Sequence, residues 1–173
     1  MARLVILTGG RAVGKSTVCR RTVALAHERG YTCRGIITLT DLGARNVVDV
    51  GSGRCRRLTS ASDDGQAVVQ GRFRFDPQTL SWGARILSRE SPCDLLVIDE
   101  LGPLEVERGE GWVTAFDRLR SRVYQLALVV VRPELLPQVQ DRTDYLAPHV
   151  RTVTRENRDR LPASLIGMVE QRT

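Results

Sequence analysis

The chain of 173 residues is 42% hydrophobic and 27% charged, which is typical of one soluble globular domain, here residues 1–173. Its longest aliphatic run, Leu126 to Val131, is too short to cross a bilayer, and the N-terminal apolar run is too short for a signal peptide, so we expect a cytoplasmic protein without membrane contacts. The net charge of +6 does not by itself indicate a nucleic-acid partner, because the basic residues are spread along the whole chain.

The first predicted elements are a strand and a helix separated by glycines. Residues 3–8 form a short apolar run that predicts a buried strand. From Ser16 the apolar residues recur with helical spacing, and Gly30 is a typical helix stop. A strand, a glycine-containing loop and a helix therefore follow one another in that order.

The loop between them, Gly9-Gly10-Arg11-Ala12-Val13-Gly14-Lys15-Ser16, matches the phosphate-binding pattern G-x-x-x-x-G-K-[ST]. Gly9 and Gly14 allow the backbone to turn so that successive N–H groups point at phosphate oxygens. Lys15 is expected to contact the β- and γ-phosphates, the Ser16 hydroxyl to coordinate Mg²⁺, and Thr17 to contact the α-phosphate. We therefore predict that residues 9–17 bind a nucleoside triphosphate together with magnesium.

The lysine count supports this interpretation. Lys15 is the only lysine among the 26 basic residues, so the other 25 are arginines. A compact ammonium fits inside a cradle of backbone N–H groups, whereas the planar fork of arginine does not. We expect Lys15 to serve both in binding and in catalysis.

The next segment, residues 33–60, contains short β-like runs separated by turn signals, which predict an antiparallel hairpin or meander. Residues 60–71 are polar and are expected to form a loop, and residues 72–75 a possible edge strand. Asp76 and Pro77 then have the composition of a helix N-cap and first helical position.

The strand predicted at residues 94–99 ends in the acid pair Asp99-Glu100. Ligands bind at the carboxyl edge of parallel sheets, so we expect Asp99 to hold magnesium opposite Ser16 and also to border the nucleotide. We expect Glu100 to polarise the attacking water. The alternative is a strand that ends in two solvated acids before a Gly-Pro turn.

Three helices and a strand are expected in the rest of the chain. Trp112, Ala115, Phe116, Leu119 and Val123 predict an amphipathic helix, residues 126–131 a buried strand, and residues 133–139 a short helix. A last helix is expected from near residue 159, with positions 161, 165 and 168 on its apolar face. The pattern predicts an α/β, three-layer fold: a mostly parallel sheet with helices on both faces and an antiparallel hairpin insertion near residues 33–60.

A further cation is expected to stabilise the negative charge that develops on the γ-phosphate. Arg132 ends the strand at residues 126–131 and should emerge at the same sheet edge as Asp99. We therefore name Arg132 as a candidate catalytic residue, with Arg11 in the loop as an alternative. The cysteines at positions 19, 33, 55 and 93 lack metal-binding spacing, and Cys19 and Cys93 are expected in or near the core.

The loop GGRAVGKST, the segment LLVIDELGPLE and the later TRENRD together resemble the THEP-type P-loop nucleoside-triphosphatases. The resemblance implies hydrolysis of ATP, GTP and other nucleoside triphosphates to diphosphate and phosphate. It also places Gly102 in the acidic segment of the nucleotide site, and it implies that Asn157, with Arg158, borders the base. Pro103 stands where the family usually has lysine, so a cation expected there must be replaced by another residue.

Two other functions stay open from the sequence alone. A small P-loop kinase would pass the γ-phosphate to an acceptor, with residues 60–74 as a lid. A slow nucleotide-binding accessory protein shares the same motifs as a fast hydrolase. The expected partner in each case is a nucleoside triphosphate, with nucleic acid an unlikely partner. A monomer is favoured, although the sequence leaves the oligomeric state open.

Overall fold

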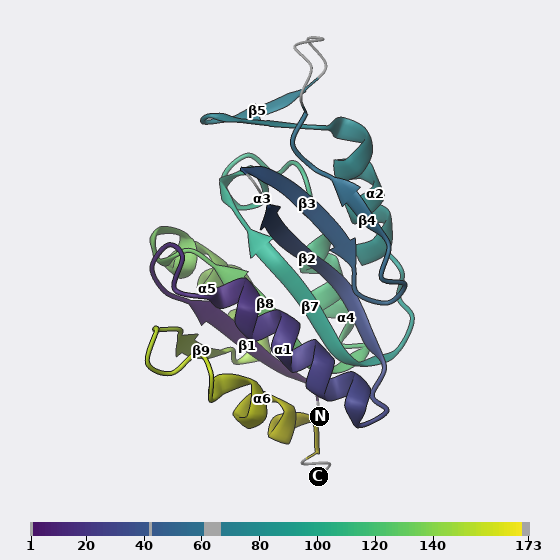
Figure 1. Ribbon diagram of the computed structural model, residues 1–173, viewed down its shortest axis with the longest axis vertical. Coiled ribbons are helices and arrows are strands. Elements are labelled where there is room, and N and C mark those ends of the chain that lie inside the picture. Colours follow the sequence, from purple (N-terminus) through teal and green to yellow (C-terminus); the bar gives the residue numbers. More distant parts are fainter. Residues whose placement is uncertain (1, 42, 61–66, 171–173) are drawn as a thin grey trace.

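The computed structural model describes residues 2–41, 43–60 and 67–170 (Figure 1). In chain order the strands are β1 (Arg3–Thr8), β2 (Cys33–Asp41), β3 (Ala44–Asp49), β4 (Cys55–Arg57), β5 (Val68–Gln70), β6 (Phe73–Phe75), β7 (Cys93–Leu101), β8 (Tyr124–Val131) and β9 (His149–Thr152). The helices are α1 (Lys15–Glu28), α2 (Pro77–Leu87), α3 (Pro103–Val106), α4 (Thr114–Ser121), α5 (Leu136–Thr143) and α6 (Leu161–Glu170), with 3-10 turns η1 (Pro133–Leu135) and η2 (Asp144–Leu146). Within these ranges, no helix combines the length and the apolar character needed to span a bilayer.

The main sheet has the strand order β4-β3-β2-β7-β8-β1-β9. The five strands from β2 to β9 pair in parallel, and β3 and β4 extend the sheet in antiparallel fashion beyond β2. This arrangement confirms the predicted α/β class and the antiparallel hairpin near residues 33–60. β2 itself belongs to the parallel part, so only β3 and β4 form the antiparallel addition.

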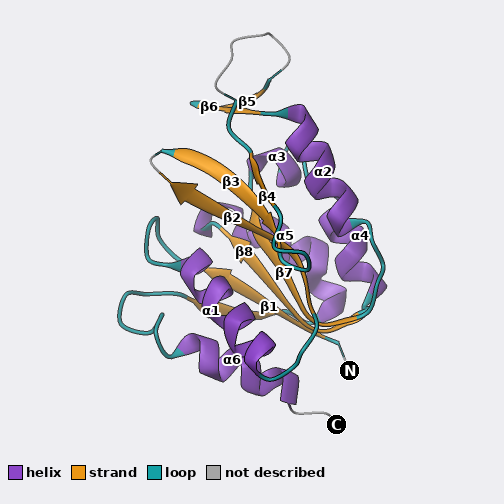
Figure 2. Ribbon diagram, turned by 45° about the vertical axis from the view of Figure 1, so that its right-hand side comes forward, coloured by secondary structure: helices purple, strands orange, loops and turns teal. Residues whose placement is uncertain are grey.

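Helices cover both faces of the sheet, as Figure 2 shows. Successive side chains of a strand point to opposite faces, and β1 illustrates this: Leu4 and Ile6 belong to one apolar core, Val5 and Leu7 to the other. The first core is closed by residues of α2, α4 and α5, and the second by residues of α1 and α6. The three-layer prediction is therefore confirmed.

The start of α2 also agrees with the sequence prediction. Asp76 is the N-cap, and its carboxylate accepts hydrogen bonds from the backbone N–H groups of Gln78 at 3.2 Å and Thr79 at 2.9 Å. Pro77 follows at the first helical position, where its missing N–H costs nothing. The cap directs the chain from β6 into a helix that covers the sheet.

The predicted helix around residues 112–123 is shorter in the structure. α4 begins at Thr114 and ends at Ser121, so Trp112 and Val123 lie outside it. The Trp112 indole instead fills the space beside Gly83 of α2, and its Nε1 donates to the Leu80 carbonyl at 3.2 Å. An aromatic residue with helical spacing thus serves as a buried anchor before the helix, because tertiary packing outweighs the local pattern.

Four other boundaries differ from the prediction. Residues 68–70, expected in a loop, pair with β6 as strand β5, whereas residues 61–66 lie outside the described residues. The helix expected to end near Val139 continues to Thr143. β9 was not predicted, because its exposed residues lack an apolar pattern. The last helix begins at Leu161 rather than near residue 159; Leu165, Ile166 and Val169 are its buried apolar side chains, and the predicted Leu161 and Met168 pack against the same core while partly exposed.

The cysteines differ sharply in exposure: Cys19, Cys33 and Cys93 are buried, and Cys55 is exposed. Burial raises the pKa of Cys33 to about 12 and that of Cys19 well above its ordinary value. Because thiolates are the reactive species, we expect one fast-reacting thiol in the native protein at neutral pH and four after unfolding. A colorimetric thiol titration measures this, and Cys55→Ser should remove the fast phase. Two or more fast phases in the native wild type would contradict the prediction.

Candidate active site

The predicted phosphate loop connects the buried end of β1 to the first turn of α1. Gly9 and Gly14 have φ angles of 135° and 108°, which side chains other than glycine rarely allow. A Cβ atom at Gly9 would stand 2.4 Å from the Val153 carbonyl oxygen, and one at Gly14 would stand 2.9 Å from Cδ of Arg158. The backbone conformation therefore favours glycine at both positions, and at Gly9 the neighbouring backbone leaves no room for a side chain.

The start of α1 is open to an anion. Gly14 is the N-cap, and within the described chain no side chain caps this end and no acidic residue occupies its first turn. The backbone N–H groups of a first helical turn have no partners inside the helix, and the helix dipole favours negative charge there. Gly10, Arg11 and Ala12 are exposed at the loop tip, and Val13, Ser16 and Thr17 are half-buried.

Lys15 lies back across the loop that contains it. Its Nζ donates to the carbonyl oxygens of Gly9 at 2.7 Å and Gly10 at 2.8 Å. Burial lowers the pKa of Lys15, and the nearby carboxylates of Glu100 and Asp99 raise it in part. The ammonium group is thereby held at the loop, on the side that faces the acid pair.

Asp99 is the least solvated acid of the site, with a relative exposure of 1%. Burial raises its pKa to about 7, although a hydrogen bond from the Ser16 side chain works in the opposite direction. Within the described residues, its Oδ2 is one of two buried side-chain oxygens without a hydrogen-bond partner, and the other is Oγ1 of Thr8. A buried carboxylate oxygen without a partner, next to a serine hydroxyl, provides the hard oxygen ligands that Mg²⁺ prefers. The residues present therefore fit the predicted magnesium site.

The acid pair lies at an irregularity in the sheet. β7 runs on to Leu101 rather than ending at Asp99, and its pairing with β8 shifts register between Ile98 and Leu101. Such irregularities redirect side chains and are frequent beside active sites. Asp99 and Glu100 can thus both face the site, although successive residues of a regular strand point to opposite faces.

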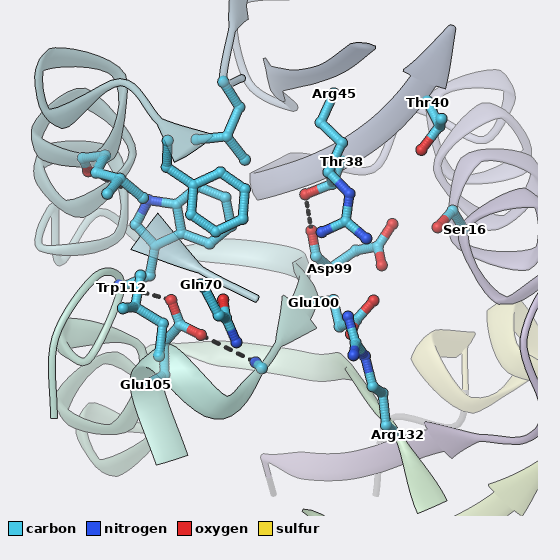
Figure 3. A pocket seen from close by; sticks show the side chains of 15 residues that line it. Ser16, Thr38, Thr40, Arg45, Gln70, Asp99, Glu100, Glu105, Trp112 and Arg132 are labelled. Atoms are coloured by element: carbon cyan, nitrogen blue, oxygen red, sulfur yellow. Dashed lines mark hydrogen bonds and ion pairs between the residues drawn. The ribbon is translucent and has the colours of Figure 1, made fainter. Parts of the chain in front are cut away.

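Glu100 forms an ion pair with Arg132, which follows β8. Arg132 therefore emerges at the sheet edge where it was predicted, but its Nε is engaged with the Glu100 carboxylate. Figure 3 shows Arg45 and Arg132 approaching the acid pair from opposite sides. The pair between Arg132 and Glu100 holds the carboxylate in place next to Asp99.

A cavity of about 90 Å³ extends from the acid pair into the interior. Its wall is polar near Asp99 and apolar near Trp112 (Figure 3). The lining residues are Ser16, Thr38, Thr40, Arg45, Leu58, Gln70, Phe75, Leu80, Asp99, Glu100, Gly102, Leu104, Glu105, Trp112 and Arg132. Thr38 of β2, Arg45 of β3 and Gln70 of β5 were not predicted as site residues, because none of them belongs to the phosphate loop or to the acidic segment.

Glu105 has a structural role that its motif does not reveal. Its buried carboxylate accepts hydrogen bonds from the backbone N–H groups of Gly102 at 2.9 Å and Trp112 at 3.1 Å. Burial raises the pKa of Glu105, and these two hydrogen bonds lower it in part. Glu105 thereby holds together both ends of the segment from Gly102 to Trp112, on which one wall of the cavity depends.

The TRENRD segment passes beside the phosphate loop. The Asn157 side chain is used within its own turn: Oδ1 accepts from the Thr154 N–H at 2.9 Å, and Nδ2 donates to the Thr152 carbonyl at 2.9 Å. Arg158, in contrast, packs against Gly14 of the loop. The structure thus places Arg158 at the phosphate loop and gives Asn157 a turn-forming role, and a contact of Asn157 with the base stays a prediction.

Comparisons with known proteins found relatives that match most of the chain. A family model described as NTPase matches residues 4–166. The nucleoside-triphosphatase THEP1 of Methanopyrus kandleri is 30% identical over 98% of this chain and 96% of its own length. THEP1 of Caldivirga maquilingensis is 30% identical over 75% of this chain and 76% of its own length.

Solved structures share the fold at lower sequence identity. A human cancer-related nucleoside triphosphatase matches with a TM-score of 0.72 and 22% identity, covering 99% of this chain and 100% of that protein. THEP1 from Aquifex aeolicus matches with a TM-score of 0.67 and 16% identity, covering 97% of this chain and 99% of that protein. At these identities the likeness supports the arrangement of the sheet and helices.

Proposed function

The chain belongs to the NTPase family and is a nucleoside-triphosphatase, and from this premise we propose how its own residues perform the hydrolysis. The proposed reaction is magnesium-dependent and converts ATP, GTP and other nucleoside triphosphates to the diphosphate and phosphate. The phosphates lie along residues 9–17, with the γ-phosphate between Lys15 and the acid pair. This placement follows from the open N-terminus of α1 and from the position of Lys15.

The observation that carries the proposal is the unpartnered carboxylate oxygen of Asp99 beside Ser16. Ser16 and Asp99 would hold Mg²⁺, which supplies positive charge to the β- and γ-phosphate oxygens when it is bound. Burial of an uncompensated carboxylate is unfavourable in the absence of a cation. We therefore infer that this pair is built for a metal-bound nucleotide.

Glu100 is the proposed general base. A water oxygen forms a bond to the γ-phosphorus while the bond from that phosphorus to the β–γ bridging oxygen breaks, and the diphosphate leaves. The water proton passes to the Glu100 carboxylate, which Arg132 holds through their ion pair. Arg132 therefore acts as a positioning residue for the base, which refines its predicted role as a direct stabiliser of the phosphate.

A phosphoryl acceptor in the cavity beside the acid pair is the second candidate. The cavity begins at Glu100 and has an apolar inner wall, so a small acceptor could reach the same γ-phosphate. Hydrolysis differs from kinase activity in needing only water. Release of phosphate without added acceptor therefore separates the two functions, and the rate of that release separates an enzyme from a slow accessory protein.

The direct test is a panel of nucleoside triphosphates scored for phosphate release by the purified protein. We expect release from ATP and GTP with Mg²⁺ and none when the metal is chelated. A Glu100→Gln variant, purified in the same way, controls for contaminating phosphatases. Metal-independent release, or release that is equal in this variant, would contradict the proposed mechanism.

Asp99→Asn should remove the loss of stability that Asp99 causes at rising pH in the absence of metal. The folded pKa of Asp99 is about 7 against 3.8 for the free side chain. The neutral acid therefore contributes fully to the free energy of unfolding below pH 4. This contribution, on the order of 4 kcal/mol, is lost as the pH rises towards 7. Denaturant unfolding at pH 5 and pH 8 should show the variant gaining stability relative to wild type at the higher pH.

The exposed Asp117 of α4 offers a matched control for this variant. Asp117→Asn should leave the pH dependence of the wild type unchanged. Magnesium with nucleoside diphosphate should raise the unfolding temperature of wild type and of Asp117→Asn more than that of Asp99→Asn. Equal pH dependence in wild type and Asp99→Asn would show that burial does not raise the pKa of this carboxyl group.

A further inference from the structure

Arg45 of β3 is a cation in the site that the phosphate and acid motifs do not include. Its backbone is fixed on both sides: its N–H donates to Thr59 Oγ1 at 3.1 Å, and its carbonyl accepts from the Leu58 N–H at 2.7 Å. Its side chain lines the cavity and points toward Asp99 and Glu100 (Figure 3). The antiparallel hairpin thus delivers a guanidinium group to the carboxyl edge of the parallel strands.

The guanidinium of Arg45 has no hydrogen-bond or ion-pair partner among the residues that the structure describes. Its contact is with an aromatic ring: Cζ lies 4.2 Å from the centroid of Phe73. Burial lowers the pKa of Arg45, and Glu100 raises it in part. The N–H donors of a half-buried guanidinium that has no protein partner are available to bind an anionic ligand.

Two other cations near the acid pair are already engaged, whereas Arg11, the alternative named from the sequence, is exposed at the tip of the phosphate loop. Lys15 donates to two carbonyl oxygens of the phosphate loop, and Arg132 is paired with Glu100. As the γ-phosphoryl group moves toward water, negative charge grows on its oxygens and on the bridging oxygen. A donor that is already oriented toward this position stabilises the transition state more than the bound substrate.

We propose that Arg45 is the catalytic arginine, which contacts the γ-phosphoryl group in the transition state and is held in place by the Phe73 ring. This inference rests on the proposed hydrolysis. It assigns to the β3 and β6 strands a part in catalysis that neither the phosphate loop nor the acid pair supplies. Phe73 is a positioning residue, because it acts through the arginine.

The test compares Arg45→Ala with Arg72→Ala. Arg72 is an exposed residue whose Cζ lies 5.1 Å from the centroid of the same Phe73 ring. Because Arg72 does not line the cavity, the Arg72→Ala substitution removes a cation beside the ring and leaves the cavity wall unchanged. We expect Arg45→Ala to lower kcat by about 100-fold or more, as removal of a transition-state donor does in other enzymes. Arg72→Ala should retain the wild-type kcat.

Binding measurements distinguish a catalytic from a structural role. Arg45→Ala should bind a non-hydrolysable ATP analogue within about threefold of wild type while losing the tight complex with nucleoside diphosphate and aluminium fluoride, which mimics the transition state. Added guanidinium ion should restore part of its kcat. Should Arg45→Ala fail to fold, Arg45→Lys supplies the same comparison, because a single ammonium lacks the planar fork.

The outcomes separate the inference from the function on which it rests. A wild-type protein that releases no phosphate contradicts the proposed function. A wild type that hydrolyses ATP, together with an Arg45→Ala variant of unchanged kcat, overturns only the assignment of Arg45. A variant whose analogue affinity falls as much as its kcat/KM also overturns it, because Arg45 would then contribute equally to substrate and transition state.

Discussion

Lys15→Ala is expected to weaken ATP binding by about 100-fold or more and to reduce hydrolysis at least as strongly. The ammonium group is held beside the phosphate loop by the carbonyl oxygens of Gly9 and Gly10. Its removal takes away the positive charge closest to the expected β- and γ-phosphates, and it leaves the Glu100 and Asp99 carboxylates to repel them. Equilibrium binding of a fluorescent ATP analogue measures the change directly.

Lys15→Arg is the matched control, since it retains the charge and changes only the shape of the group. Because the planar fork does not fit the cradle of the loop, we expect this variant to bind ATP more weakly than wild type. The alanine variant should keep its folded state, because Lys15 is half-buried and, among the residues that the structure describes, its side chain hydrogen-bonds to its own loop alone. Unchanged ATP affinity in the alanine variant would contradict the phosphate-loop assignment itself.

Glu100→Gln should preserve nucleotide affinity within about threefold while lowering kcat by about 10²- to 10⁴-fold. Glutamine keeps the shape of the side chain but cannot accept the proton of the attacking water. The variant also loses the charge that pairs with Arg132, so the arginine is expected to become more mobile. Single-turnover phosphate release, measured at saturating nucleotide, separates the chemical step from binding.

Glu134→Gln provides the control for the loss of one negative charge. Glu134 is exposed in η1 and contributes to the electrostatic environment of Lys15, but it does not line the cavity. Its variant should hydrolyse ATP at nearly the wild-type rate. A Glu100→Gln variant as active as Glu134→Gln would mean that another group activates the water.

The phosphate loop and the acid pair could be predicted because their chemistry depends on residues that are close in sequence. An apolar strand, two glycines, one lysine and a helical repeat specify the loop locally. Asp99 was predicted for the same reason, since an acid that ends a buried parallel strand emerges at the ligand-binding edge. The predicted sheet and its two helical layers followed from the same alternation of strands and helices.

Local pattern was less reliable where a residue's partner is distant in sequence. Trp112 has helical spacing relative to Ala115 and Leu119, yet it lies before α4 because the gap beside Gly83 accommodates its indole. Residues 68–70 look like part of a polar loop and become strand β5 only by pairing with β6. β9 has no apolar pattern in its sequence, and it forms a strand because its backbone pairs in parallel with the edge of β1.

The sequence by itself located the glycine loop predicted to bind phosphate and the acid pair, because a contiguous motif specifies each. Only the tertiary structure decided the arrangement of the cations. Among 25 arginines no local pattern distinguishes Arg45, which reaches the site across an antiparallel hairpin, or shows that Arg132 is engaged by Glu100. Charges act through space over a few ångströms, so their partners are set by the packing of strands far apart in the chain.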